Sequence, residues 1–240
     1  RGATKGSTIR FSVYSAYENA YAELFADAKK RGVNVRFTTS ESAAEDDPSF
    51  FAVLRKSLGT NVKKPTYLNL CQKACNTRGA GDGFMHAKIG IFSGVLGKNG
   101  KVHKNVVLLT SGNLSSGFTS MWNHSYELLK HNKLYSGLRT YLDGSSLNRT
   151  KHNFSTVTDG RFTVRFYPGS KLTLHPAYSA LKDVNCAAKK GYGNKQGRTV
   201  IRVMMSIWDK DHDDIANLLS ALSKKKCDVS VAIATNADKT

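Results

Sequence analysis

The chain has 240 residues, of which 40% are hydrophobic, and this is enough for one large domain or two packed halves with a true core. No apolar run approaches the roughly 18 residues that a membrane span requires. Lysine and arginine number 36 against 18 acidic residues, which gives a net charge of +18. This balance favours an anionic partner, such as nucleic acid, acidic lipid or a phosphate-bearing substrate, over plain solubility.

The hydrophobic pattern predicts a β-α-β unit near each end of the chain. The first consists of a strand, a helix that ends at Gly32 and a second strand, in residues 8–14, 17–31 and 33–38. Each such unit should pair its strands in parallel. The second has the same order, in residues 199–205, 211–226 and 228–234.

The two units also share short matches of sequence. Ile9-Arg10 matches Ile201-Arg202 at an offset of 192 residues, and residues 29–35 match residues 225–231 at an offset of 196. Chance similarity between two β-α-β units is the alternative explanation. We interpret the matches as a duplicated architecture with a small insertion in the helix region.

Further elements and polar loops are expected between the two units. Strands are predicted at 106–109, 124–130 and 161–167, helices at 134–142 and 176–186, and polar loops at 39–50, 93–104 and 187–198. The predicted organisation is a complete first repeat in residues 1–186, a loop in residues 187–198, and the truncated start of a second repeat in residues 199–240. Since the chain begins at Arg1-Gly2 without a methionine, we interpret it as a processed product that has lost a signal peptide.

Four cysteines allow three disulfide pairings. Cys71 and Cys75 are close enough to form a local clip, and Cys186 at a helix end could bond Cys227 at the start of a strand. These two disulfides would indicate an oxidising compartment. Zinc is the rival interpretation, but the Cys71–Cys75 pair has no second close pair of Cys or His to complete a tetrahedral site.

The stretch from Met85 to Phe92 contains the most informative pattern. If it is a strand, side chains alternate, so His86, Lys88 and Gly90 share one face. An imidazole and an ammonium about two strand rises apart, roughly 6–7 Å, suit a tetrahedral phosphate. Lys88 could hold the phosphate oxygens, His86 could attack phosphorus or deliver a proton, and Gly90 would leave room beside them. A chance surface pair is the alternative for this motif alone.

A second polar group follows the strand at 106–109. Ser111 and Asn113 are two residues apart, so their hydroxyl and amide could donate hydrogen bonds to the same phosphate oxygens. A polar turn at the end of a strand is the alternative, since glycine and asparagine, the residue types at 112 and 113, are common in turns.

Together these residues resemble the phospholipase D superfamily, whose signature is H-x-K-x4-D followed by G/S-S-x-N. The chain departs from this signature at Ser93, which occupies the position of the aspartate. It is more similar to a secreted, largely bacterial branch, in which serine commonly replaces that aspartate. Further similarity to this branch lies in Cys71-x3-Cys75, Ser111-Gly112-Asn113-Leu114, Trp122-Asn123, Cys186 and Cys227-Asp228-Val229.

The resemblance implies an α/β fold, a phospholipase D-like mixed-sheet sandwich flanked by helices, in which each half supplies one H-x-K motif. It implies that His86 attacks phosphorus to form a phosphohistidine, while the histidine of the other half protonates the leaving alcohol. It implies no metal and no cofactor. Family members often carry a carboxylate that orients a catalytic histidine, and Glu127 is the candidate here, with an ordinary strand-edge carboxylate as the alternative.

The leading hypothesis is therefore a secreted phospholipase D that hydrolyses phospholipid head groups at an anionic surface. A nuclease of the same superfamily acting on DNA or RNA, and a non-catalytic phosphate-binding fragment, are the alternatives. The second H-x-K would fall near position 282, beyond Thr240, and His212 has no lysine two positions on. We therefore expect a C-terminal half that carries this motif, either as a separate fragment or as a continuation of the chain.

Overall fold

A computed structural model describes residues 2–72, 75, 85–116, 123–145, 156–166, 176–205, 208 and 213–233. The chain divides into two compact units, Arg1–Ser170 and Lys171–Thr240. This boundary lies earlier than residue 186, where the first repeat was expected to end, because the segment before Cys186 packs with the second unit. Trp122 and His212 lie outside the described residues.

The first unit is built on a six-stranded sheet of order β3-β2-β1-β4-β5-β6. Strands β1, β2 and β3 are parallel to one another, and β4, β5 and β6 follow with antiparallel pairing. A small hairpin, β7–β8, is separate from this sheet. The elements are β1 (Thr8–Ser12), α1 (Asn19–Lys30), β2 (Asn34–Ser40), α2 (Glu41–Asp46), α3 (Pro48–Leu58), β3 (Tyr67–Cys71), β4 (Ile89–Leu96), β5 (Val102–Thr110), β6 (Ser125–Leu128), α4 (Asn132–Ser145), β7 (Val157–Asp159) and β8 (Phe162–Val164).

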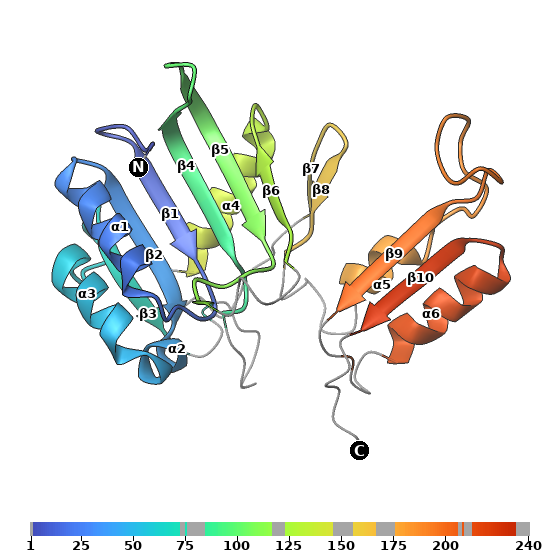
Figure 1. Cartoon of the computed structure of the whole chain (residues 1–240), viewed down its shortest axis with the longest axis horizontal. Coiled ribbons are helices and arrows are strands. Elements are labelled where there is room, and N and C mark those ends of the chain that lie inside the picture. Colours follow the sequence, from blue (N-terminus) through green and yellow to red (C-terminus); the bar gives the residue numbers. More distant parts are fainter. Residues whose placement is uncertain are drawn as a thin grey trace. The chain divides into compact units, whose positions relative to one another are not determined.

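Helices cover both faces of this sheet, with α1 and α3 on one face and α4 on the other (Figure 1). The alternation of side chains along the strands separates the two cores. Phe11 packs with Phe25 and Phe37, and Phe37 packs with Phe50, in an aromatic cluster under α1 and α3. On the other face, Ile91 belongs to a second cluster with residues of α4. The expected mixed sheet flanked by helices is confirmed.

The prediction of a polar loop at residues 39–50 is wrong, because this stretch contains α2 and the start of α3. Proline occupies the first turn of α3, where it lacks only a hydrogen bond that a helix start never makes. The side chain of Asp47 caps the helix by accepting a hydrogen bond from the backbone N of Phe50 at 3.4 Å. Aspartates that resemble a loop in sequence are thus the start signal of a buried helix.

The polar loop predicted at residues 93–104 is also wrong, because it is the tip of the β4–β5 hairpin. Ladder pairing continues to Leu96 and Val102, which face each other. Only a short turn remains, closed by the backbone N of Gly97 donating to the O of Lys101 at 2.8 Å. The polar residues are compatible with strands here because one end of the hairpin extends into solvent.

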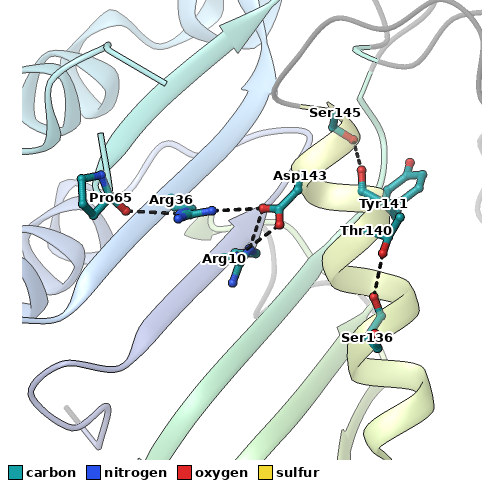
Figure 2. Close-up of polar contacts among 8 residues, drawn as sticks. All are labelled: Arg10, Arg36, Pro65, Ser136, Thr140, Tyr141, Asp143 and Ser145. Carbon is teal, nitrogen blue, oxygen red and sulfur yellow. Dashed lines mark hydrogen bonds and ion pairs between the residues drawn. The ribbon is translucent and has the colours of Figure 1, made fainter. Parts of the chain in front are cut away.

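Two arginines stand opposite each other on the α4 face of the parallel strands. Arg10 of β1 pairs in register with Arg36 of β2, an arrangement in which like charges repel. Asp143 of α4 lies between them (Figure 2). Its carboxylate accepts hydrogen bonds from Arg10 at 2.7 Å (Nε) and 3.2 Å (Nη2), and from Nη1 of Arg36 at 3.3 Å. Asp143 therefore offsets one of the two positive charges, reduces the repulsion between the arginines and attaches α4 to the parallel half of the sheet.

The second unit contains the predicted second β-α-β. Strands β9 (Val200–Met205) and β10 (Asp228–Ile233) are parallel, with Ile201 facing Val229. Helix α6 (Asp213–Lys224) packs on them through a core that includes Leu219. Helix α5 (Pro176–Leu181) adds residues to the same core, and it is shorter than the predicted 176–186.

The two β-α-β units keep the predicted offset of 192 residues at their first strands, where Thr8 corresponds to Val200, but the offset of 196 predicted at the helix end is wrong. Each helix exits through a residue with positive φ, Gly32 at 83° and Lys226 at 71°. The next residue then donates its backbone N to the helix, Val33 to Ala28 at 3.1 Å and Cys227 to Leu222 at 3.0 Å. This places the helix exits 194 residues apart, not 196. A two-residue slip preserves the alternation of a strand, so the sequence pattern alone did not detect it.

The expected disulfides are present, with Cys71 bonded to Cys75 and Cys186 to Cys227. The first links the end of β3 to the segment that leads towards the H-x-K motif. The second joins the loop before β9 to the start of β10. None of the helices in the described residues is long and apolar enough to cross a membrane.

Replacing Asp143 with alanine should lower the free energy of unfolding by about 1–3 kcal/mol, because it leaves two arginines facing each other without their shared acceptor. The Arg10 side chain is only 11% exposed. Asp27→Ala is the matched control, since the Asp27–Lys30 ion pair is exposed and should change stability by about 0.5 kcal/mol or less. Urea unfolding of both variants measures the difference, and equal effects would contradict the role given to Asp143.

Candidate active site

The H-x-K segment lies just before β4 and not within it, because β4 begins at Ile89. Its backbone is nevertheless held between two strands. The hydroxyl of Ser12 donates to the O of Ala87 at 3.2 Å, and the backbone N of Thr110 donates to the O of Lys88 at 3.2 Å. The segment is therefore fixed at the point where β1 ends, β4 begins and β5 ends.

His86 and Lys88 are in direct contact. The Nζ of Lys88 lies 3.1 Å from both ring nitrogens of His86, and it donates to the backbone O of His86 at 3.0 Å. The separation of 6–7 Å expected from two strand rises is therefore wrong, because the lysine side chain folds back onto the ring. Lys88 is buried and only 8% exposed, whereas His86 is exposed.

This environment assigns different charges to the two groups. Burial lowers the pKa of Lys88 to about 8. Although the His86 side chain is exposed, its imidazole is partly desolvated, and this desolvation, and secondly the charge of Lys88, lower the pKa of His86 below its usual value of 6.5. Near neutral pH the site therefore contains an ammonium beside an uncharged imidazole. An uncharged imidazole has the free electron pair that a nucleophile or base requires, and the ammonium can hold an anion.

Tyr14 is a site residue that the sequence motifs did not reveal. Its ring lies 4.7 Å from the ring of His86, centroid to centroid, and the Nζ of Lys88 lies 5.5 Å from the centre of the same ring. Because Ser12 faces Ile89 across the antiparallel β1–β4 pair, the residues after Ser12 run past the H-x-K segment. No spacing in the sequence marks Tyr14, since this contact depends on the pairing of distant strands.

The sequence suggested that Gly90 leaves room for a substrate, and this expectation is wrong. A Cβ at this position would lie 3.0 Å from the ring of Phe11, so the space beside Gly90 is occupied by the aromatic core. The glycine therefore permits the ring of Phe11 to pack directly against the backbone of β4.

Asn113 lies beside this segment and helps to close it. Its Oδ1 accepts a hydrogen bond from the backbone N of Ser15 at 3.3 Å, and the backbone N of Leu114 donates to the O of Ser15 at 3.1 Å. The amide nitrogen of Asn113 makes no hydrogen bond with the described residues. One end of this side chain thus fixes the loop after β1, and the other can donate to a ligand.

Ser111 already uses its hydroxyl within a turn. It donates to the Oδ1 of Asn123 at 3.0 Å and accepts from the backbone N of His124 at 3.1 Å. Donation from Ser111 to a phosphate would require the bond to Asn123 to break.

Neither Glu127 nor Ser93 makes a hydrogen bond to His86 or Lys88 within the described residues. Glu127 is exposed on β6 opposite Leu108, and within the described residues its carboxylate makes no hydrogen bond or ion pair. Ser93, at the aspartate position of the motif, accepts a hydrogen bond from the backbone N of Thr8 at 2.8 Å. Its role in this structure is to hold the start of β1. The described part of the chain brings together no three His, Cys, Asp or Glu side chains that could hold a metal ion.

Similarity to known proteins was found among solved structures. No protein-family model matches the chain. No curated protein matches it either. NucT from Helicobacter pylori is 18% identical with a TM-score of 0.45, covering 59% of this chain and 79% of that one. Nuc from Salmonella typhimurium, described as a phospholipase D family member, is 16% identical with a TM-score of 0.43, covering 67% and 84%.

Polyphosphate kinase from Porphyromonas gingivalis is 12% identical with a TM-score of 0.57, and the match covers 97% of this chain and 34% of that one. The chain shares its fold with part of this kinase. All three identities are low, so the likeness concerns the fold alone, and the two lower TM-scores carry no further argument.

Replacing Tyr14 with leucine should lower the pKa of Lys88 below its value of about 8, by roughly half a pH unit, because an aromatic face stabilises an ammonium and leucine does not. Tyr14→Phe keeps the ring and should keep the pKa. Titration of labelled lysine Cε by NMR measures both variants in the absence of substrate. A leucine variant with an unchanged pKa, or a phenylalanine variant that falls equally, would contradict the cation–π contact.

Proposed function

We propose that this chain is a phosphodiesterase, and specifically a secreted phospholipase D that hydrolyses phospholipid head groups through a phosphohistidine intermediate. The observation that carries the proposal is the contact between His86, with its lowered pKa, and the buried Lys88. An uncharged nucleophile next to a fixed cation is the pair that attack on an anionic phosphodiester requires.

The proposed reaction has two displacements at phosphorus. In the first, a ring nitrogen of His86 forms a bond to phosphorus as the bond to the leaving alcohol oxygen breaks, and a general acid protonates that oxygen. In the second, water attacks phosphorus, the bond to His86 breaks, and the water proton passes to the base left by the first step. Lys88 holds the non-bridging oxygens in both steps, and its ammonium stabilises the charge that they carry in the transition state.

The remaining expected residues have supporting roles in this scheme. The free amide end of Asn113 can donate to the same oxygens, while its other end stays on Ser15. Ser111 contributes by holding the turn, and its hydroxyl reaches a phosphate only if it exchanges partners. Glu127 would orient a histidine of the complete site, a role that its exposed carboxylate permits but that no contact in the described residues supports.

The general acid is proposed to come from a second H-x-K in a C-terminal half. Unit 2 contains the start of such a half. Within the described residues β10 pairs with β9 alone, so the other edge of β10 has no partner strand. Val231 of β10 corresponds to Phe37 at the offset of 194 residues. Phe37 is fully buried and packs on Phe50 and Phe51 of α3, whereas Val231 is 44% exposed. A helix and strand like α3 and β3 would cover this position.

Secretion is supported by the two disulfides, which persist in oxidising compartments. The net charge of +18 suits an anionic lipid surface and also the phosphates of DNA. The substrate class is therefore the main question for experiment.

His86→Ala in the complete enzyme should abolish phosphodiesterase activity, with a loss of several orders of magnitude in rate, because the nucleophile is removed. The assay compares phosphatidylcholine vesicles with plasmid DNA, both in EDTA, and the proposal expects turnover of the lipid. His103→Ala, at the start of β5, is the matched control and should retain activity. A folded His86 variant that stays active contradicts the site, whereas cleavage of DNA alone contradicts the lipid assignment.

The 240-residue chain should be inactive as a monomer and active together with the segment that carries the second H-x-K. Loss of general-acid catalysis costs roughly 10² to 10⁴ in rate. Mass measurement of the native protein identifies any segment that travels with the chain, and assays of the separated and recombined parts follow. Full turnover by a confirmed monomer of this chain would overturn the composite site.

A further inference from the structure

The loop between α5 and β9, residues 187–198, is held firmly in shape despite its Gly- and Lys-rich sequence (Figure 1, orange segment before β9). Its two ends pair with each other through Ala187 and Arg198. Inside the loop, the Oδ1 of Asn194 accepts hydrogen bonds from the backbone N of Gln196 at 3.0 Å and of Arg198 at 2.9 Å. Compact surface loops of this kind are frequently functional.

Two further contacts attach the loop to the start of β10. The Nδ2 of Asn194 donates to Asp228 at 3.0 Å, and the Cys186–Cys227 disulfide lies directly before both segments. Gly193 has a φ of 83°, and a Cβ there would lie 2.4 Å from the O of Arg198, so only glycine permits this path. The loop is therefore ordered before any ligand binds, which lowers the entropic cost of binding.

Positive charge is concentrated on the loop of residues 187–198 and beside it. The loop and the neighbouring end of α6 expose seven cations, and none of them forms an ion pair with an acid in the described residues. Asp228, the carboxylate that contacts the loop through Asn194, is also engaged by Arg202 at 2.9 Å. We call this the basic loop surface; its cations are Lys189, Lys190, Lys195, Arg198, Lys224, Lys225 and Lys226.

Apolar side chains are exposed on the same loop. Tyr192 is 77% exposed and Val200, which follows the loop, is 39% exposed. Both line an open recess of about 500 Å³ together with Lys189. An exposed tyrosine among lysines combines an apolar ring, a polar tip and cations, as side chains at a membrane–water interface do.

We infer that the basic loop surface binds an anionic lipid surface, separately from the H-x-K site. Lysine predominates over arginine among its cations, and lysine acts as a point charge, whereas arginine supplies the bidentate geometry used for individual nucleic-acid phosphates. The surface also offers one exposed aromatic ring, whereas single-stranded nucleic acids are bound by several rings in succession. Both features favour a diffuse anionic surface over a nucleic acid.

The test measures binding without turnover, so it does not depend on the proposed reaction. In the His86→Ala background, the full chain is sedimented with vesicles of phosphatidylcholine alone and with vesicles that also contain phosphatidylglycerol. Lys189→Ser, Lys190→Ser and Lys195→Ser in combination should lower affinity for the anionic vesicles by about 10²-fold. The matched control, Lys56→Ser, Lys63→Ser and Lys64→Ser, removes the same charge from unit 1 and should change affinity by about threefold or less.

Tyr192→Ser provides a second measurement that charge alone would not affect. Insertion of the ring at the interface is not screened by salt, so this variant should lose about tenfold in affinity at both low and high salt. The inference is overturned if both triple variants lose affinity equally, or if the Lys189, Lys190 and Lys195 variant binds anionic vesicles like its parent. It is also overturned if the Lys189, Lys190 and Lys195 variant keeps its affinity for anionic vesicles and loses affinity only for a single-stranded DNA oligomer.

Discussion

The packing of α4 in the first unit depends on a single carboxylate that binds two arginines whose charges repel each other. Arg10 and Arg36 face each other in the parallel pair β1–β2, where their charges repel, and Asp143 binds both. Asp143 belongs to α4, which also contacts β1, β4 and β5, so the helix spans the parallel and the antiparallel halves of the sheet, which the β1–β4 ladder joins. The aromatic core on the opposite face stabilises the parallel half but does not reach α4.

The candidate active site lies at the seam between these two halves, where β1 pairs with β4. Tyr14 comes from the end of the parallel half, and His86 and Lys88 come from the entry to the antiparallel half. Asn113 closes the seam through Ser15. A shift between the halves would therefore change the contacts of His86 and Lys88 and the burial that lowers their pKa values.

Elements with a continuous hydrophobic period were predicted well, and those with polar residues in regular structure were not. The strands and helices of both β-α-β units lie close to their predicted positions, because each buries one clear apolar face. Helix α3 begins in a polar stretch at Asp47, and the tip of the β4–β5 hairpin extends into solvent, so both looked like loops. The sequence pattern could not reveal the two-residue shift between the repeats, because such a shift leaves the alternation of β10 unchanged.

The sequence by itself predicted a phosphate-binding pair at His86 and Lys88 and the pairing of the cysteines, since residue types, short spacings and local order carry that information; the structure confirms the cysteine pairing. It could not reveal Tyr14, the contact between Lys88 and His86, or the occupation of the space beside Gly90 by Phe11. These depend on β1 and β4 becoming neighbours, although about 80 residues separate them in sequence. Only the tertiary structure decided how far Lys88 and His86 are desolvated there, and desolvation is the main cause of their lowered pKa values.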